Sequence, residues 1–122
     1  MQKIAFAVPL SSEKRGRFLS FAALIRGERN ADFRSFLERM NTTEEHWFLQ
    51  KFDESELFIC YIASPDLKAA FEQLAVSQHP FDIWIKQENK DIFGMDFESP
   101  SSDPMPEVLL QCNIESTPSY SW

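Results

Sequence analysis

The chain has 122 residues, of which 43% are hydrophobic and 14% aromatic, so it can form one domain with a substantial core but not two. Its 19 acidic and 12 basic residues give a formal net charge of −7, which argues against nucleic acid and anionic membranes as partners, because phosphate binding needs a concentrated basic face. No stretch reaches the roughly 18 to 20 apolar residues of a membrane helix. The N-terminal apolar run lacks a signal-peptide cleavage pattern, so we expect a cytoplasmic protein.

The N-terminal part of the chain predicts a strand followed by a long helical stretch. Bulky apolar residues alternate with alanines over residues 3–9, and this period of two predicts a strand. Beyond it, apolar residues recur at the spacing of an amphipathic helix: Phe18, Phe21, Ala22, Ile25, Phe33, Phe36, Leu37 and Met40. Because all of them lie on one stripe, residues 13–40 can form one helix or two, with Gly27 as the place for a break.

The middle of the chain predicts a hairpin and two further helices. Two aromatic and β-branched runs, residues 46–52 and 57–62, flank a short polar connector and therefore predict antiparallel strands. The segment Ser64-Pro65-Asp66 offers a cap, a proline and an acid, which together mark the start of a helix. The segment His79-Pro80 marks the start of another helix in the same way.

The C-terminal part of the chain predicts a connector, a last strand and a tail. Residues 95–106 contain three prolines and three serines without periodicity, so they read as a connector. Residues 108–114 resume a strand pattern, and residues 115–122 form the tail. The order of elements predicts one α+β domain over residues 1–114, a ferredoxin-like βαββαβ two-layer sandwich with an extra helix before the last strand. In that topology the sheet order is 4-1-3-2 and the helices share one face.

The predicted hairpin strands are apolar on both faces, although an antiparallel sheet with one wet face should alternate polar with apolar residues. In the second of these strands, Leu57, Ile59 and Tyr61 lie on one face, and Phe58, Cys60 and Ile62 lie on the other. The helix-free face is therefore expected to be covered, either by a second subunit of a homodimer or by the connector and tail.

The two cysteines, Cys60 and Cys112, are too few and too far apart for a zinc motif or a disulfide framework. In the predicted sheet they lie on strands separated by the first strand, about 9 to 10 Å apart. That distance exceeds the roughly 7 Å between Cα atoms that a disulfide can span. We expect both to be free thiols in the core.

Two charged residues occupy positions where the helical period requires apolar groups. Arg29 falls within the first stripe, and Glu88 lies between Trp84 and Ile92 on the stripe of the last helix. Because buried unpaired charges are costly, one interpretation is that Arg29 and Glu88 pair with each other or reach the rim. The other is that they line a cavity in which Arg29 binds an anion, with Arg26 one turn away to assist.

His46 and His79 are the only histidines, so either is a candidate general base near neutral pH. The alternative is that each is a turn or edge residue bonded to the backbone. A metal site made of His46, His79 and Glu88 is a further alternative. However, the sequence has no H-x-x-x-H or C-x-x-C spacing, no G-x-S-x-G and no glycine-rich phosphate loop. We therefore expect no metal and no cofactor.

The aromatic residues are the other resource for a site. Trp47, Tyr61, Phe81 and Trp84 can line an apolar pocket for a flat ligand, or can belong to a core that holds many of the twelve phenylalanines. We place the candidate ligand-binding site between the helices and the sheet. Its predicted residues are Arg29, His46, Trp84 and Glu88.

Three segments carry a family resemblance: HWFLQ (46–50), ELFICYI (56–62) and SQHPFDIW (77–84). They are similar to small bacterial proteins of unknown function related to the dimeric α+β barrel group, and the likeness covers residues 3–97. The group includes stress-responsive barrel proteins, haem-degrading enzymes and cofactor-free antibiotic-biosynthesis monooxygenases. The resemblance implies a ferredoxin-like dimer with pockets between helices and sheet. No catalytic motif of those enzymes is matched, so it implies no activity.

Three functional hypotheses follow from these observations. The first is a dimeric protein that binds a small anionic or aromatic molecule. The second is a cofactor-independent monooxygenase-like enzyme, in which His46 or His79 deprotonates an activated phenol or enol. The third is a structural or regulatory partner-binding domain. The sequence leaves open whether the protein is an enzyme.

Overall fold

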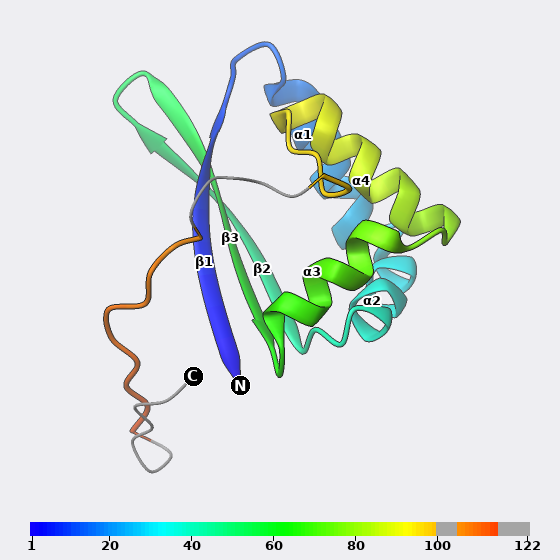
Figure 1. Ribbon diagram of the computed structural model, residues 1–122. Coiled ribbons are helices and arrows are strands. Elements are labelled where there is room, and N and C mark those ends of the chain that lie inside the picture. The colour runs from blue at the N-terminus through cyan, green and yellow to red at the C-terminus, as the bar shows by residue number, and fades with distance from the viewer. Residues whose placement is uncertain (100–104, 115–122) are drawn as a thin grey trace.

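The computed structural model describes residues 1–99 and 105–114 and shows a sheet covered by helices on one face (Figure 1). Its elements, in chain order, are β1 (Gln2–Leu10), α1 (Arg15–Arg26), α2 (Asn30–Arg39), β2 (Glu44–Phe52), β3 (Ser55–Ser64), α3 (Leu67–Val76) and α4 (Pro80–Phe93). The sheet is antiparallel with the order β1-β3-β2. The predicted α+β class and the predicted order of the first three strands are therefore confirmed. None of the described helices is long and apolar enough to cross a membrane.

The helical stretch before β2 is divided into two helices at Gly27, the predicted place for a break. The amide of Gly27 bonds to the carbonyl of Leu24 at 3.3 Å, and the amide of Arg29 bonds to the same carbonyl at 2.8 Å. These contacts close α1 and start α2 in a new direction. A Cβ at Gly27 would lie 3.0 Å from the backbone oxygen of Ala23, so a side chain would be crowded there.

The later helices begin and end on local capping signals. The Asp66 carboxylate accepts a hydrogen bond from the amide of Ala69 at 3.1 Å, so Asp66 is the N-cap of α3. His79 caps α4, whose first residue is Pro80, and Gly94 ends it in the left-handed conformation with φ 72°. The predicted helix starts are thus present, with Asp66 rather than Ser64 in the capping position.

The core lies between the helices and the sheet and is largely aromatic. Most of the predicted helical stripe is buried: Phe18, Phe21, Ile25, Phe33, Phe36 and Met40 are each at most 7% exposed, and Ala22 and Leu37 are half-buried. Trp47 of β2 lies among them, with ring centroids 5.4 Å from Phe21, 5.7 Å from Phe33 and 5.6 Å from Phe58. Such edge and offset contacts add to the burial of apolar area. The rings therefore fix how α1 and α2 sit over the sheet.

The segment after the connector departs from the sequence prediction. Residues 105–113 have no regular secondary structure, so the predicted strand over 108–114 is not formed beside β1. A strand needs an edge to pair with and a face to bury, whereas Leu109, Leu110 and Ile114 are 89%, 81% and 98% exposed. Cys112 lies in this segment and is exposed. Both cysteines are free as predicted, but the prediction that both lie in the core is wrong for Cys112.

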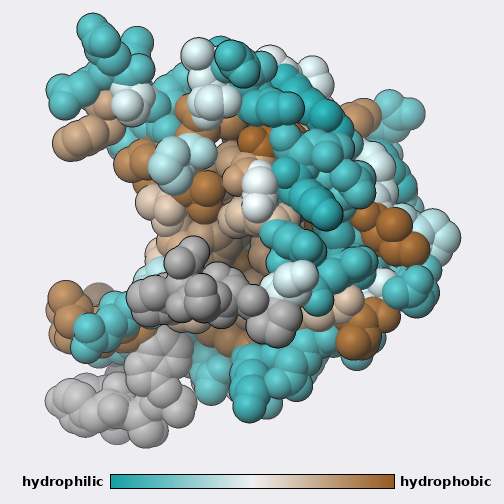
Figure 2. Space-filling view, turned by 45° about the horizontal axis from the view of Figure 1, so that its top comes forward, coloured by the Kyte–Doolittle hydropathy of each residue, from teal (hydrophilic) through white to brown (hydrophobic). Residues whose placement is uncertain are grey.

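The helix-free face of the sheet is apolar, as the strand pattern predicted. Residues of neighbouring strands meet there in rows, such as Ala7, Ile59 and Phe48. Figure 2 shows apolar side chains, brown and tan, gathered in a hollow of the surface. Phe48 and Phe52 are 57% and 65% exposed, so the described part of the C-terminal segment does not cover them.

Candidate functional site

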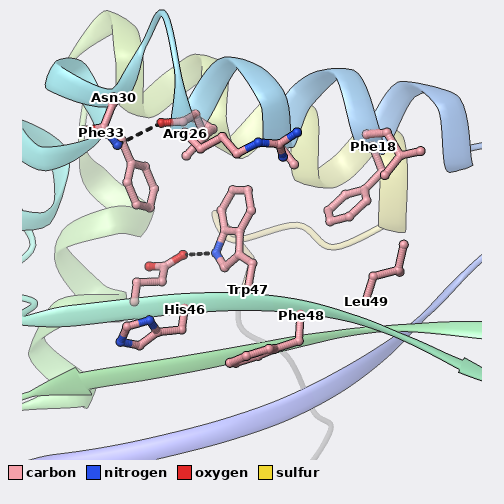
Figure 3. A pocket seen from close by; sticks show the side chains of 12 residues that line it. Phe18, Arg26, Asn30, Phe33, His46, Trp47, Phe48 and Leu49 are labelled. Atoms are coloured by element: carbon pink, nitrogen blue, oxygen red, sulfur yellow. Dashed lines mark hydrogen bonds between the residues drawn. The ribbon is translucent and has the colours of Figure 1, made fainter.

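An open groove of about 380 Å³ lies between α1, the start of α2 and β2 (Figure 3). Its walls are mainly apolar: Phe18, Ala22 and Ile25 from α1, Phe33 from α2, and Trp47 and Leu49 from β2. Four polar residues, Arg26, Asn30, Glu45 and His46, also line it. An apolar hollow with a few polar groups is the usual form of a small-molecule site.

The alternation of β2 decides which of its side chains face the groove. Successive side chains of a strand point to opposite faces, so Glu45, Trp47 and Leu49 share one face. Trp47 and Leu49 pack against the helical core, and in Figure 3 the Trp47 indole stands between the sheet and α1. His46 and Phe48 point to the opposite side of the strand in the same view.

Glu45 is held at one oxygen only. Its Oε2 accepts a hydrogen bond from Trp47 Nε1 at 2.6 Å and lies 3.9 Å from the thiol sulfur of Cys60. Cys60 is the β3 partner of Trp47, so the strand register brings both donors to the same carboxyl. No described residue donates to Oε1. Since no buried polar side-chain atom of the described chain lacks a hydrogen bond, Oε1 must reach solvent.

Burial gives Glu45 unusual acid–base properties. Removal of its carboxyl from water raises its pKa from 4.5 to about 7, although hydrogen bonds from Trp47 and Cys60 and the charge of His46 act in the opposite direction. Burial also raises the pKa of the Cys60 thiol, with a further contribution from Glu45, so Cys60 stays protonated at neutral pH. Glu45 can therefore take up or release a proton in the physiological range.

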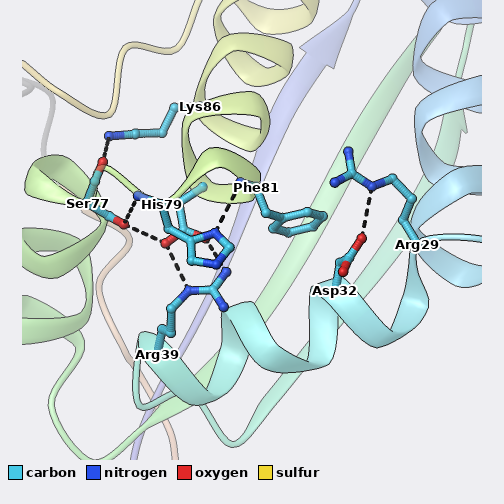
Figure 4. Close-up of polar contacts among 8 residues, drawn as sticks. Arg29, Asp32, Arg39, Ser77, His79, Phe81 and Lys86 are labelled. Atoms are coloured by element: carbon cyan, nitrogen blue, oxygen red, sulfur yellow. Dashed lines mark hydrogen bonds and ion pairs between the residues drawn. The ribbon is translucent and has the colours of Figure 1, made fainter.

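A second polar cluster, between α2 and the α3–α4 connection, is fully paired (Figure 4). Asp82 is 0% exposed and accepts hydrogen bonds from Arg39 Nη2 at 2.5 Å, Arg39 Nε at 3.2 Å and Ser77 Oγ at 2.6 Å. Burial alone would raise the pKa of Asp82, but these bonds and the charge of Arg39 lower it. The buried Lys86 ammonium lies 3.0 Å from the Ser77 carbonyl and 3.0 Å from Glu98. This cluster fastens helices together and presents no open group.

The predicted pairing of Arg29 with Glu88 is wrong. Arg29 lies 3.2 Å from Asp32, and its guanidinium stacks over Trp84, 4.3 Å from the ring centroid. Glu88 instead pairs with Arg17 of α1 at 3.1 Å. The break at Gly27 explains the difference, because Arg29 becomes the N-cap of α2 and leaves the stripe of α1.

Of the two histidines, His46 lines the groove but points its ring to the other side of β2, and His79 does not line it. His46 Nε2 lies 2.9 Å from Glu44 on the helix-free side, and its ring centroid is 5.7 Å from Tyr61. His79 Nδ1 accepts the amide of Phe81 at 3.2 Å, which is a capping role. Within residues 1–99 and 105–114, no three His, Cys, Asp or Glu side chains come together as a metal site.

The structure therefore does not gather the four predicted site residues in one place. Arg29 and Trp84 stack on each other, Glu88 lies on a separate ion pair, and His46 reaches only the rim of the groove. Sequence reasoning missed Glu45. The available signal was an acid on the inward face of a strand, two residues before an inward tryptophan.

Comparison with protein-family models, with curated proteins and with solved structures gives no match for this chain. The structure itself defines the class: a small α+β domain with a three-stranded antiparallel sheet and helices on one face, over the residues described. Its distinguishing feature is the groove with the half-buried carboxyl of Glu45, which forms no ion pair with a described residue.

Proposed function

We propose that this protein binds a small flat aromatic molecule in the groove between α1 and β2, and that it does so as a homodimer. The observation that carries the proposal is a largely apolar groove of about 380 Å³ that is lined by Glu45, whose carboxyl has one oxygen without a donor among the described residues. The rings of Phe18, Phe33 and Trp47 offer faces for stacking. Arg26 lines the groove from α1 and suits an anionic substituent. The family resemblance is consistent with this location for a pocket.

Filling the groove tests the binding proposal. Ala22 lines the groove, so Ala22→Leu places a larger side chain within it. Its neighbour Ala23 is exposed and does not line the groove, so Ala23→Leu is the matched control. With indole and benzoate as probes, ligand-detected NMR should show binding to the natural protein and to Ala23→Leu, and reduced binding to Ala22→Leu. Equal binding to all three would place the site elsewhere.

The dimer in this proposal forms through the helix-free face of the sheet. That face exposes Phe48 and Phe52, and large exposed apolar patches mark interaction surfaces. The C-terminal segment also exposes Leu109 and Leu110. Pairing of residues 108–114 in the assembly would complete the ferredoxin-like βαββαβ order. The resemblance to the dimeric α+β barrel group implies the same arrangement.

Light scattering tests the dimer. Phe48→Asp places a charge on the helix-free face and should convert the dimer to a monomer, because a buried unpaired carboxylate is costly. Val76→Asp is the matched control, since Val76 is 68% exposed on α3, on the helical side. A natural protein that stays monomeric at high concentration contradicts the dimer. In that case the exposed face would be the binding surface in the third hypothesis, a partner-binding domain.

The groove also bears on the enzyme alternative. Neither His46 nor His79 faces its interior, because one lies on the helix-free side and the other caps α4. Glu45 is the group in the groove that can exchange a proton near neutral pH. A cofactor-independent monooxygenase-like reaction in this groove would therefore use Glu45 as its base. Unchanged turnover of a phenol or enol substrate in Glu45→Gln would contradict this version of the enzyme.

A further inference from the structure

We propose that Glu45 recognises a neutral N–H or O–H donor on the bound aromatic molecule, so that binding is coupled to release of a proton from its carboxyl. This inference rests on the proposed binding function and names the ligand chemistry that the groove selects. It concerns a residue that forms no ion pair within the part of the chain that the structure describes.

Glu45 differs from the buried charged residues Asp82 and Lys86 in its bonding partners. Asp82 bonds to Arg39, Lys86 bonds to Glu98, and both pairs close within the protein. Glu45 bonds only to an indole N–H and a thiol, which are neutral donors. A buried carboxylate without a cation is destabilising. We therefore expect a bound molecule to stabilise the charge of Glu45.

Glu45 and Asn30 each have a side-chain oxygen that can still accept a hydrogen bond. Glu45 Oε2 is occupied by Trp47 and Cys60, whereas Oε1 is open to solvent. Asn30 donates its side-chain N–H to the carbonyl of Ile25 at 3.2 Å. Its Oδ1 is then a second acceptor, to which no described residue donates a hydrogen bond. Two acceptors in an apolar groove select a ligand that donates hydrogen bonds.

The charged and titratable groups around Glu45 determine whether another group could cause a pH dependence of binding. Apart from Glu45 itself, the titratable groups that line the groove or bond to Glu45 are Arg26 from α1, His46 from β2 and Cys60 from β3. Around the smaller hollow on the other side of Glu45, the lining residues from α2, α3 and the loop before β2 are uncharged. Cys60 stays a thiol, and the His46 ring points to the opposite face. Glu45 is thus the group facing the groove interior whose charge changes near neutrality.

The sign and size of the coupling follow from these contacts. A neutral donor binds the carboxylate, since a protonated carboxyl offers a poorer acceptor. Because burial raises the Glu45 pKa to about 7, the carboxylate fraction rises about tenfold from pH 6 to pH 8. Affinity for a neutral donor should rise by about the same factor, and a proton should leave on binding. An anionic ligand would show the opposite dependence.

Calorimetry with two probes tests the inference. Indole is a neutral N–H donor and benzoate is an anion. Each is titrated at pH 6 and pH 8, in phosphate and in an amine buffer (Bis-Tris at pH 6, Tris at pH 8) whose heat of ionisation differs from that of phosphate. Indole should bind about tenfold more tightly at pH 8 than at pH 6. Because the Glu45 pKa is about 7, binding should release about 0.9 proton at pH 6 and only about 0.1 proton at pH 8. Glu45→Gln should abolish both effects. His46→Gln should keep them, which separates Glu45 from its neighbour.

The results distinguish failure of this inference from failure of the proposed function. If indole binds with an affinity that does not change with pH, or if benzoate binds better and more tightly in acid, Glu45 is not the group that selects a neutral donor. Groove binding then still stands through the Ala22→Leu comparison. If neither probe binds at either pH, the proposed function falls and this inference falls with it.

Discussion

Replacing Glu45 by glutamine is expected to stabilise the protein above pH 7. The amide keeps the size of the side chain and an oxygen for the Trp47 N–H, but removes the ionisable group. Burial raises the Glu45 pKa from 4.5 to about 7, and each pKa unit corresponds to about 1.4 kcal/mol, so ionisation lowers the free energy of unfolding by up to roughly 3 kcal/mol. Because Oε1 reaches solvent, water reduces this cost, and we expect a gain of about 1 to 3 kcal/mol.

The pH dependence of the difference identifies its cause. The folded protein binds the Glu45 proton more tightly than the unfolded chain does, so the contribution of Glu45 to stability is highest at low pH. It falls as the pH rises from about 4.5 to about 7 and then levels off. Urea unfolding of the natural protein and of Glu45→Gln should therefore give curves of stability against pH that diverge over this window.

Two comparisons make this test decisive. His46→Gln changes the adjacent residue, whose side chain lies on the other face, and should leave the pH dependence in place. Subtracting the curves of the natural protein and Glu45→Gln cancels contributions from other carboxyls such as Asp82. Parallel curves between pH 5 and pH 8 would refute the reasoning, because they would show that Glu45 is solvated like an ordinary surface glutamate.

Two further predictions concern the buried ion pair and the thiols. Arg39→Ala leaves the Asp82 carboxylate buried without its cation, so urea unfolding should show a loss of about 3 to 5 kcal/mol. Arg15→Ala breaks a pair whose arginine is 49% exposed and should cost less than about 1 kcal/mol; equal losses would contradict this ranking. A thiol reagent should label Cys112 at once in the folded protein and Cys60 only after unfolding, because Cys60 is buried with a raised pKa. Rapid labelling of a Cys112→Ser variant would show that Cys60 is accessible.

Much of the architecture was predictable from local sequence patterns. The period-two runs located the three strands, and the helical spacing located the buried face of α1 and α2. These predictions hold because the side-chain periods of strands and helices follow from backbone geometry and require no distant contact. Start signals act within one helical turn, so the helix starts after Ser64-Pro65-Asp66 and at His79-Pro80 were readable as well, although the cap of α3 is Asp66 and not Ser64.

The predictions that failed involve contacts between distant residues. Arg29 was placed on a continuous stripe, and the break at Gly27 moved it to an N-cap beside Asp32 and Trp84. The run over residues 108–114 has a strand pattern, but a pattern forms a strand only where an edge is available to pair with it.

The sequence by itself determined the strands, the helices and the apolar character of both faces of the sheet, because these depend on spacing along the chain. Only the tertiary structure decided that Glu45 has a raised pKa. Its position on an inward face could be read from alternation, but its acidity depends on the Cys60 thiol of the next strand and on helices that exclude water. A pKa is set by the surroundings of a group, and those surroundings exist only once the chain has folded.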